Sequence, residues 1–239
     1  MLARTCRVLT AKMASPLRWN DELPMTIDYS HVREMMVEQQ VRPWEVLDIR
    51  VLDVLARLPR EAFVAESHRA LAYTDVELPL GHGQKMMKPV VEGRTLQALD
   101  LQPGDEVLEI GTGSGYISAC LGQLAREVLS LEIQPELAER ARRNLDAAKL
   151  GSNVRIEVAD ALNWQTQRQF DAICITGAVE TVPGQFLKML RPGGRLFVIQ
   201  GKSPVMEALL INADGSSKSL FETDIDHLQG AAPAPQFQL

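Results

Sequence analysis

The sequence predicts an α/β fold in which helices cover a mostly parallel sheet. From residue 106 onward, short runs of aliphatic and β-branched residues alternate with segments of helical length. A glycine-rich turn, "GTGSG", follows the first of these apolar runs directly. Alternating strands and helices indicate parallel strands joined by helical crossovers. The 239 residues, 46% of them apolar, suit one such domain with an N-terminal elaboration.

A helical cap is predicted before the sheet, over residues 25–89. Ser30 is a candidate N-cap for a helix whose apolar residues keep helical spacing and which ends before Pro43. A second helix is expected in "EVLDIRVLDVLARL", and it stops at Pro59. The next stretch, "REAFVAESHRALAY", predicts a loop and a short helix. We therefore expect these segments to form helices and loops, not a sheet, and a strand end at Leu-Pro-Leu, residues 78–80, just before the acceptor-side loop.

The predicted sheet occupies residues 90–228. A helix in "VVEGRTLQALDL" precedes a Pro-Gly turn, and "RPGG" predicts another turn near the end of the sheet. "MEALLIN" and "KSLFET" predict a closing antiparallel hairpin, and residues 229–239 predict an irregular tail. The expected parallel strands are residues 106–110, 127–133, 153–158, 170–176 and 195–200, with helices in 135–150 and 182–190.

Residues 1–24 form an N-terminal extension of a different composition. The first 20 residues contain four Lys or Arg residues and no acid, which is the composition of a transit peptide. They equally fit an upstream start, because Met25 opens the helical pattern of the cap. We favour the second interpretation.

Composition excludes several classes of function. The formal net charge of −6 disfavours a nucleic-acid partner, since such affinity depends on Lys and Arg neutralising phosphates. The three cysteines are far apart and odd in number, which predicts no disulfide framework and a reducing, cytoplasmic location. No apolar run is long enough to cross a membrane. The histidines show no metal-ligand spacing, so we predict no metal site.

The main site signal is "LEIGTGSGY", residues 108–116. Glycines between a strand and a helix let backbone N–H groups approach a ligand, because no Cβ stands in the way. A dinucleotide fingerprint needs a small residue where this chain has Tyr116, so a nicotinamide oxidoreductase is disfavoured.

Acidic side chains at the ends of the next two strands extend this signal. Glu132 lies about 20 residues past the loop, where a carboxylate can accept both hydroxyls of a ribose. Asp160 ends the following strand at the same carboxyl edge, and Thr176 ends a fourth. An isolated acid at a strand end is usually only solvated, but these lie where a nucleoside ligand needs them.

This constellation resembles class I S-adenosylmethionine-dependent methyltransferases. The resemblance implies a Rossmann-like sheet of seven strands, mostly parallel, with an antiparallel C-terminal hairpin, and S-adenosyl-L-methionine as the cofactor. It places Asp160 at the adenine, Glu132 at the ribose and Glu109 with the glycine loop at the methionine end. The cofactor-binding residues it implies are Glu109, Gly111, Thr112, Gly113, Ser114, Gly115, Glu132, Ile133, Asp160, Ala161 and Thr176.

A closer resemblance, over about residues 25–211, is to protein-L-isoaspartate O-methyltransferases. It lies in "MVEQQV", "RVLDVLARLPREAFV", "LAYTDVELPLGHGQ", "VLEIGTGSGY" and "FDAICITGA". Such enzymes methylate the α-carboxyl of isoaspartyl residues in damaged proteins, so the resemblance implies a protein or peptide partner. The acceptor pocket it implies contains Leu80, Gly81, His82, Gly83, Gln84, Lys85, Met86, Met87 and Met206.

The chain departs from that family inside the implied acceptor pocket. Where the family has Thr-Ile-Ser, this chain has Lys85, Met86 and Met87, and Met206 stands near a family glutamine. A thioether cannot donate a hydrogen bond, so Met87 cannot replace the serine hydroxyl and we assign no catalytic residue. Lys85 or Lys88 could supply a replacement charge, or both lysines could simply be solvated.

Three hypotheses therefore remain open. The first is methylation of isoaspartyl carboxyls, with the activity reduced or retargeted. The second is methylation of another acceptor, such as a small apolar acid or phenol, for which His82 could act as a base although a structural role fits it better. The third is a cofactor-binding homologue without turnover. The sequence gives no oligomeric state.

Overall fold

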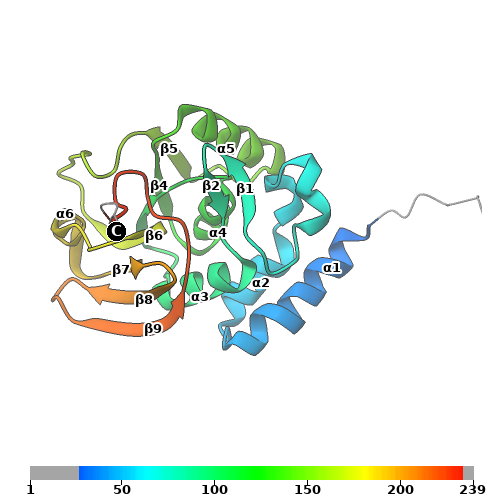
Figure 1. The fold of residues 1–239 in the computed structure, drawn as a ribbon, viewed down its shortest axis with the longest axis horizontal. Helices are drawn as coiled ribbons and strands as arrows, with labels where there is room; N and C mark the ends of the chain where they lie inside the picture. The colour runs from blue at the N-terminus through cyan, green and yellow to red at the C-terminus, as the bar shows by residue number, and fades with distance from the viewer. Residues whose placement is uncertain (1–26, 234–239) are drawn as a thin grey trace, which may run out of the picture.

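The computed structural model describes residues 27–233 and contains the predicted seven-stranded sheet (Figure 1). The predicted extension, residues 1–24, and most of the predicted tail lie outside the described residues. The strand order is β5-β4-β3-β6-β7-β8-β9, parallel from β5 to β7 and antiparallel at β8 and β9. Chain order therefore reverses between β3 and β6, and ligands of open α/β sheets bind at such a point.

Strand positions in the parallel part agree closely with the prediction. Apolar residues alternate between the two faces, so β3 contributes Val107 to one hydrophobic cluster and Leu108 to the other. The strands are β3 Glu106–Ile110, β4 Glu127–Glu132, β5 Val154–Val158, β6 Phe170–Val179 and β7 Leu190–Lys202. The helices beside them are α3 Pro89–Leu99, α4 Tyr116–Leu124, α5 Pro135–Ala148 and α6 Gly184–Lys188.

The sheet ends in β8 Val205–Asn212 and β9 Ser217–Thr223, which form the predicted antiparallel hairpin. The predicted turn at "RPGG" lies within β7, which starts at Leu190, and it interrupts the pairing with β6, because the register shifts between Leu190 and Arg195 and Gly193 has a φ of 79°. After β9 the chain returns alongside β6. The Ala178 N–H donates to the Asp226 carbonyl at 2.9 Å, and the Leu228 N–H donates to the Ala178 carbonyl at 2.8 Å.

The cap begins with α1 Tyr29–Met36, which continues as η1 Val37–Val41 and η2 Arg42–Trp44, and lies to one side of the sheet (Figure 1). The predicted N-cap is wrong by two residues. Asp28, not Ser30, has the extended backbone of a cap, and its carboxylate accepts the His31 N–H at 3.3 Å. The helical segment was predicted to end before Pro43, but Pro43 lies inside the 3₁₀ helix η2.

The second helix, α2 Ile49–Arg57, starts later than predicted, after Asp48 as the N-cap. Two 3₁₀ helices follow, η3 Arg60–Phe63 and η4 Glu66–Leu71. A buried ion pair then joins the cap to α3: Arg60 donates to both oxygens of Glu92 at 3.0 Å, and neither side chain is exposed. Arg60 also donates to the carbonyls of Ala72 and Met87. This arginine therefore holds three segments of the chain together.

The cap also contains a two-stranded sheet, which includes the predicted strand end at residues 78–80 but whose pairing was not predicted. Strands β1 Leu78–Gly81 and β2 Gln84–Met86 pair as an antiparallel hairpin. Its turn has three successive residues with positive φ, Gly81, His82 and Gly83. A tight turn of this kind favours glycine. The "GHGQ" segment therefore forms a hairpin turn.

Candidate active site

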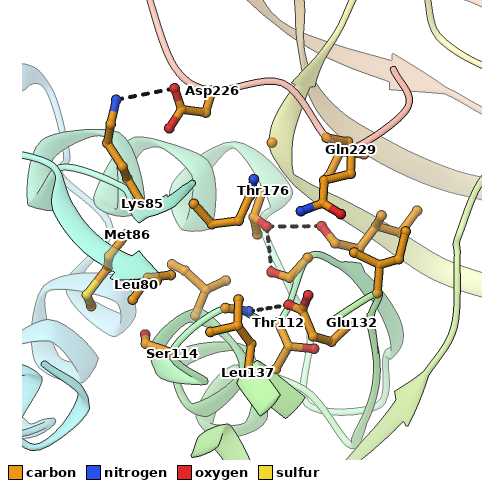
Figure 2. Close-up of a pocket in the computed structure, with 18 of the residues that line it drawn as sticks. Leu80, Lys85, Met86, Thr112, Ser114, Glu132, Leu137, Thr176, Asp226 and Gln229 are labelled. Atoms are coloured by element: carbon orange, nitrogen blue, oxygen red, sulfur yellow. Dashed lines mark hydrogen bonds and ion pairs between the residues drawn. The ribbon is translucent and has the colours of Figure 1, made fainter. Parts of the chain in front are cut away.

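A cavity opens at the carboxyl ends of β3 and β4, between the β1–β2 hairpin and the segment after β9 (Figure 2). It lies where the strand order reverses, as expected for an α/β sheet. The predicted site residues that line it are Leu80, Gln84, Lys85, Met86, Met87, Gly111, Thr112, Gly113, Ser114, Glu132, Ile133, Asp160, Ala161 and Thr176.

At Gly111 and Gly113 the loop backbone itself borders the cavity. Gly111 and Gly113 have φ of 95° and 55°, a region that side-chain-bearing residues rarely adopt. A Cβ on Gly111 would lie 2.4 Å from Oγ1 of Thr176, whose hydroxyl contacts the Gly111 carbonyl at 2.6 Å. The loop is therefore fixed against β6, and a larger residue at Gly111 would displace it.

Glu132 ends β4 at the edge of the cavity and is only 5% exposed. Its Oε2 accepts the Gly113 N–H at 2.8 Å, and its Oε1 accepts the Gln134 N–H at 3.0 Å. These bonds fix the carboxylate beside the glycine loop. Each oxygen keeps a lone pair for a further donor, such as a ligand hydroxyl.

Asp160 lies after β5 and lines another part of the same cavity. Its Oδ1 accepts the Leu162 N–H at 3.0 Å, and its Oδ2 accepts the side-chain amide of Asn163 at 2.6 Å. These bonds hold the carboxylate in a turn beside Ala161 and Leu162. The structure thus brings the glycine loop, Glu132 and Asp160 to one cavity, as predicted.

Glu109 does not line the cavity, which departs from its predicted position at the methionine end. Its side chain is fully buried, and it accepts hydrogen bonds from Ser118 of α4 and Ser130 of β4. Burial raises the pKa of this carboxyl to about 8, although both serine bonds lower it. Thr112 contacts Ser130 at 2.5 Å, so Glu109 supports the glycine loop from behind.

Other predicted pocket residues lie elsewhere. The hairpin turn is exposed at Gly81, His82 and Gly83. The strands of the hairpin line the cavity, and its turn does not. Met206 is 2% exposed in the main hydrophobic core, since alternate residues of β8 face inward. Gly115 packs against Ala141 of α5.

The part of the cavity formed by Leu80 and residues 84–87 consists mostly of apolar side chains. Met86 and Met87 are 5% and 6% exposed, and both line the cavity together with Leu80. Lys85 is the exception: its Nζ lies 3.2 Å from a carboxylate oxygen of Glu77 and 3.2 Å from one of Asp226. Lys88 instead lines a separate hollow with Trp44 and Asp224.

Sequence reasoning missed the segment after β9. Ile225, Asp226, Leu228 and Gln229 all line the cavity, and the Gln134 side chain donates to Gln229 Oε1 at 2.8 Å. No periodic pattern marks this segment in the sequence. Its hydrogen bonds to β6 could not be foreseen, because they join backbone groups of segments that are far apart in the chain. Glu77 and Glu92 were also missed.

Comparison with known proteins then decides the family. The family profile of protein-L-isoaspartate(D-aspartate) O-methyltransferase (PCMT) matches residues 31–223. The chain belongs to this family. A protein-L-isoaspartate O-methyltransferase of Marinobacter nauticus is 41% identical over 184 residues, which cover 77% of this chain and 84% of the relative. One of Myxococcus xanthus is 45% identical over 166 residues, covering 69% and 78%.

Solved structures agree with the PCMT fold. A structure described as a protein-L-isoaspartate O-methyltransferase of Plasmodium falciparum, in complex with S-adenosyl-L-homocysteine, matches with a TM-score of 0.73. It covers 82% of this chain and 97% of its own, at 19% sequence identity, so the likeness concerns the fold. The class I methyltransferase fold predicted from the sequence is confirmed.

The cavity also has the chemistry that a PCMT cofactor requires. Gly111 and Gly113 carry no side chain, and Glu132 presents a fixed carboxylate beside them. Ile133 and Leu162 add apolar surface near Asp160. A nucleoside joined to an amino-acid tail suits this combination of apolar walls, a carboxylate and a glycine loop that a ligand can approach closely. Among residues 27–233, no cluster of His, Cys, Asp and Glu could hold a metal ion, and no helix is long and apolar enough to cross a membrane.

Proposed function

We propose that this PCMT chain transfers a methyl group from S-adenosyl-L-methionine to the α-carboxyl of L-isoaspartyl residues in proteins or peptides. The observation that supports it most is that the glycine loop, the strand-end acids and residues 84–87 line one continuous cavity. Cofactor and acceptor can therefore meet there. The family match over residues 31–223 supports the same reaction.

Within this proposal, the cofactor half of the cavity holds three parts of the ligand. Glu132 accepts hydrogen bonds from the ribose hydroxyls, and Asp160 accepts one from the adenine amino group. The loop from Gly111 to Ser114 contacts the methionine end. The loop does not have to move to do so, because Glu132 and Thr176 already fix it.

The acceptor half aligns the nucleophile. In the transfer, a carboxylate oxygen forms the new bond to the methyl carbon as the carbon–sulfur bond breaks, and its electron pair stays on sulfur in S-adenosyl-L-homocysteine. A carboxylate is already ionised at neutral pH, so no general base is needed. The buried Met86 and Met87 exclude water from the acceptor end and shape the cavity.

Methylation of matched peptides tests this function. Radiolabelled S-adenosyl-L-methionine is incubated with the protein and with peptides that differ only in isoaspartyl or aspartyl at one position. The isoaspartyl peptide is expected to accept label at least tenfold faster. Equal rates with both peptides would contradict the isoaspartyl carboxyl as the acceptor. Such a result would not contradict cofactor binding.

A second acceptor class has one observation in its favour, the apolar surface contributed by Leu80, Met86 and Met87. A small apolar acid could also pack there. Methyl transfer to a component of a small-molecule extract, without transfer to isoaspartyl peptides, would select this class. Transfer to the peptides alone would exclude the small-molecule acceptor.

A further inference from the structure

At the acceptor end, Lys85 of β2 forms ion pairs with two acidic side chains. Its ammonium lies 3.2 Å from Oε2 of Glu77 and 3.2 Å from Oδ1 of Asp226. All three residues line the cavity, and Figure 2 shows Lys85 and Asp226 pointing toward one another, with Glu132 farther along the cavity. The pair therefore lies at the end of the cavity away from the proposed ribose carboxylate.

The segment that supplies Asp226 is fixed. The Asp226 carbonyl accepts the Ala178 N–H at 2.9 Å, and the next residue forms a bridge to the end of β6. On the other side, Arg140 of α5 donates to the Leu80 carbonyl in the β1 strand at 2.5 Å. Both partners of the Lys85–Asp226 pair are thus attached to rigid elements.

The pair leaves hydrogen-bonding capacity unused. An ammonium has three donors, and the two carboxylates take two of them. Oδ2 of Asp226 is buried, and no group within residues 27–233 donates to it. A buried carboxylate oxygen without a donor is costly, and because the Asp226 side chain as a whole is 39% exposed, a rotation of its carboxylate brings Oδ2 to a ligand N–H.

An isoaspartyl residue presents both complementary groups. Its α-carboxylate is free, and the amide N–H of the following residue lies a few bonds away on the side-chain branch. Resting on the proposed function, we infer that Lys85 and Asp226 recognise the acceptor as a pair: Lys85 donates to the α-carboxylate, and Asp226 Oδ2 accepts the neighbouring amide N–H. Lys85 thereby determines specificity for a charged acceptor.

The arrangement explains how the acceptor end works without a serine hydroxyl at Met87. The hydrogen bond to Glu77 raises the pKa of Lys85 most, and the bond to Asp226 raises it further. The ammonium therefore stays charged throughout the neutral range. A charge-assisted bond to a carboxylate is about twice as strong as a neutral one. Lys88 cannot serve in its place, because it lies in the other hollow.

Peptide binding to the protein saturated with S-adenosyl-L-homocysteine tests the pair without depending on turnover. Isothermal titration compares an isoaspartyl peptide with the same peptide bearing an α-carboxamide. The wild type is expected to bind the carboxylate at least tenfold more tightly. Lys85→Gln is expected to abolish that preference, and Lys88→Gln is the matched control that keeps it.

A third peptide, methylated on the amide nitrogen after the isoaspartyl residue, tests Asp226. It is expected to bind the wild type about tenfold more weakly than the parent peptide, whereas Asp226→Ala is expected to bind both equally. Asp224→Ala, which removes a neighbouring carboxylate outside the cavity, is expected to behave as the wild type. Folding of each variant is checked by its affinity for S-adenosyl-L-homocysteine.

The results separate this inference from the proposed function. If the wild type prefers isoaspartyl over aspartyl peptide but Lys85→Gln keeps the carboxylate preference, the recognition pair is wrong and the function stands. Equal sensitivity of Asp226→Ala and wild type to amide methylation would likewise remove the role of Asp226. If the wild type does not distinguish isoaspartyl from aspartyl peptide, both proposals fail.

Discussion

Two glutamates near the glycine loop show how environment decides the role of one residue type. Glu109 lies inside the protein between two serines, and its Oε1 has no donor among residues 27–233. Glu132 lies on the cavity and accepts two backbone N–H groups. Both residues end or nearly end a strand, so the sequence pattern does not distinguish them. The difference comes from which neighbours each side chain meets.

Glu109→Gln is expected to change how stability depends on pH. The folded state holds the Glu109 proton up to about pH 8, whereas the unfolded chain releases it near 4.5. The unfolded state therefore binds fewer protons between these values, and the free energy of unfolding falls as pH rises, by at most about 1.4 kcal/mol per pH unit. Glutamine carries no such proton, so this decline is expected to disappear.

Urea unfolding at pH 5, 6, 7 and 8 measures this effect. Glu207→Gln, at an exposed position of β8, is the control and should retain the wild-type pH dependence. A parallel pH dependence in wild type and Glu109→Gln would show that Glu109 is ionised in the folded protein at neutral pH.

Glu132→Ala is expected to weaken binding of S-adenosyl-L-homocysteine. It removes the proposed ribose contacts and leaves the Gly113 N–H without its acceptor. Hydrogen bonds to a charged group contribute about 1.5–3 kcal/mol, so the affinity should fall about 10- to 100-fold. Calorimetric titration measures it, with Glu136→Ala on the exposed side of α5 as control. An unchanged affinity would place the ribose elsewhere.

At the scale of elements, the cap is joined to the methyltransferase sheet by buried polar contacts as well as apolar packing. The Arg60–Glu92 pair links η3 to α3, and Arg60 also donates to the carbonyl before α3 and to one at the end of η4. All three nitrogens of the Arg60 guanidinium therefore donate a hydrogen bond. Burial of such a pair specifies how the elements meet more than it stabilises them.

Glu92→Leu is expected to destabilise the protein by about 3–5 kcal/mol, because it leaves the Arg60 charge buried without its partner. The double variant Arg60→Met/Glu92→Leu should recover most of that loss, since it removes both charges. Urea unfolding of the two variants and the wild type gives the comparison. A double variant no more stable than Glu92→Leu would mean that Arg60 matters mainly for the carbonyls it holds.

At the scale of the whole molecule, the cavity is lined by the cap hairpin, the sheet and the segment after β9 together. A ligand there contacts all three, so binding should stabilise the entire described fold. Unfolding then becomes coupled to cofactor concentration.

S-adenosyl-L-homocysteine at 100 times its dissociation constant is expected to add about 2.7 kcal/mol to the free energy of unfolding. For a protein of this size the melting temperature should rise by about 5–10 °C in a single transition. Differential scanning calorimetry measures the shift. Two transitions, only one of which moves, would show that cap and sheet unfold separately.

The strands, the glycine loop and the strand-end acids could be predicted from the sequence, since each depends on neighbours close in the chain. Apolar runs between turn residues mark β3, β4 and β6, and the strand-end position of Glu132 follows from them. Asp28 as N-cap and the β1–β2 pairing were not predicted, because several local signals competed there and packing selected among them.

The sequence by itself therefore determined the sheet, the carboxyl edge at which the site lies and, through its motifs, the family. Only the tertiary structure decided which side chains share the cavity. It buried Glu109 and Met206, exposed His82, and brought Asp226 to Lys85 across 141 residues of chain. The physical reason is that local periodicity specifies a strand or helix, whereas a contact between distant segments depends on how those elements pack.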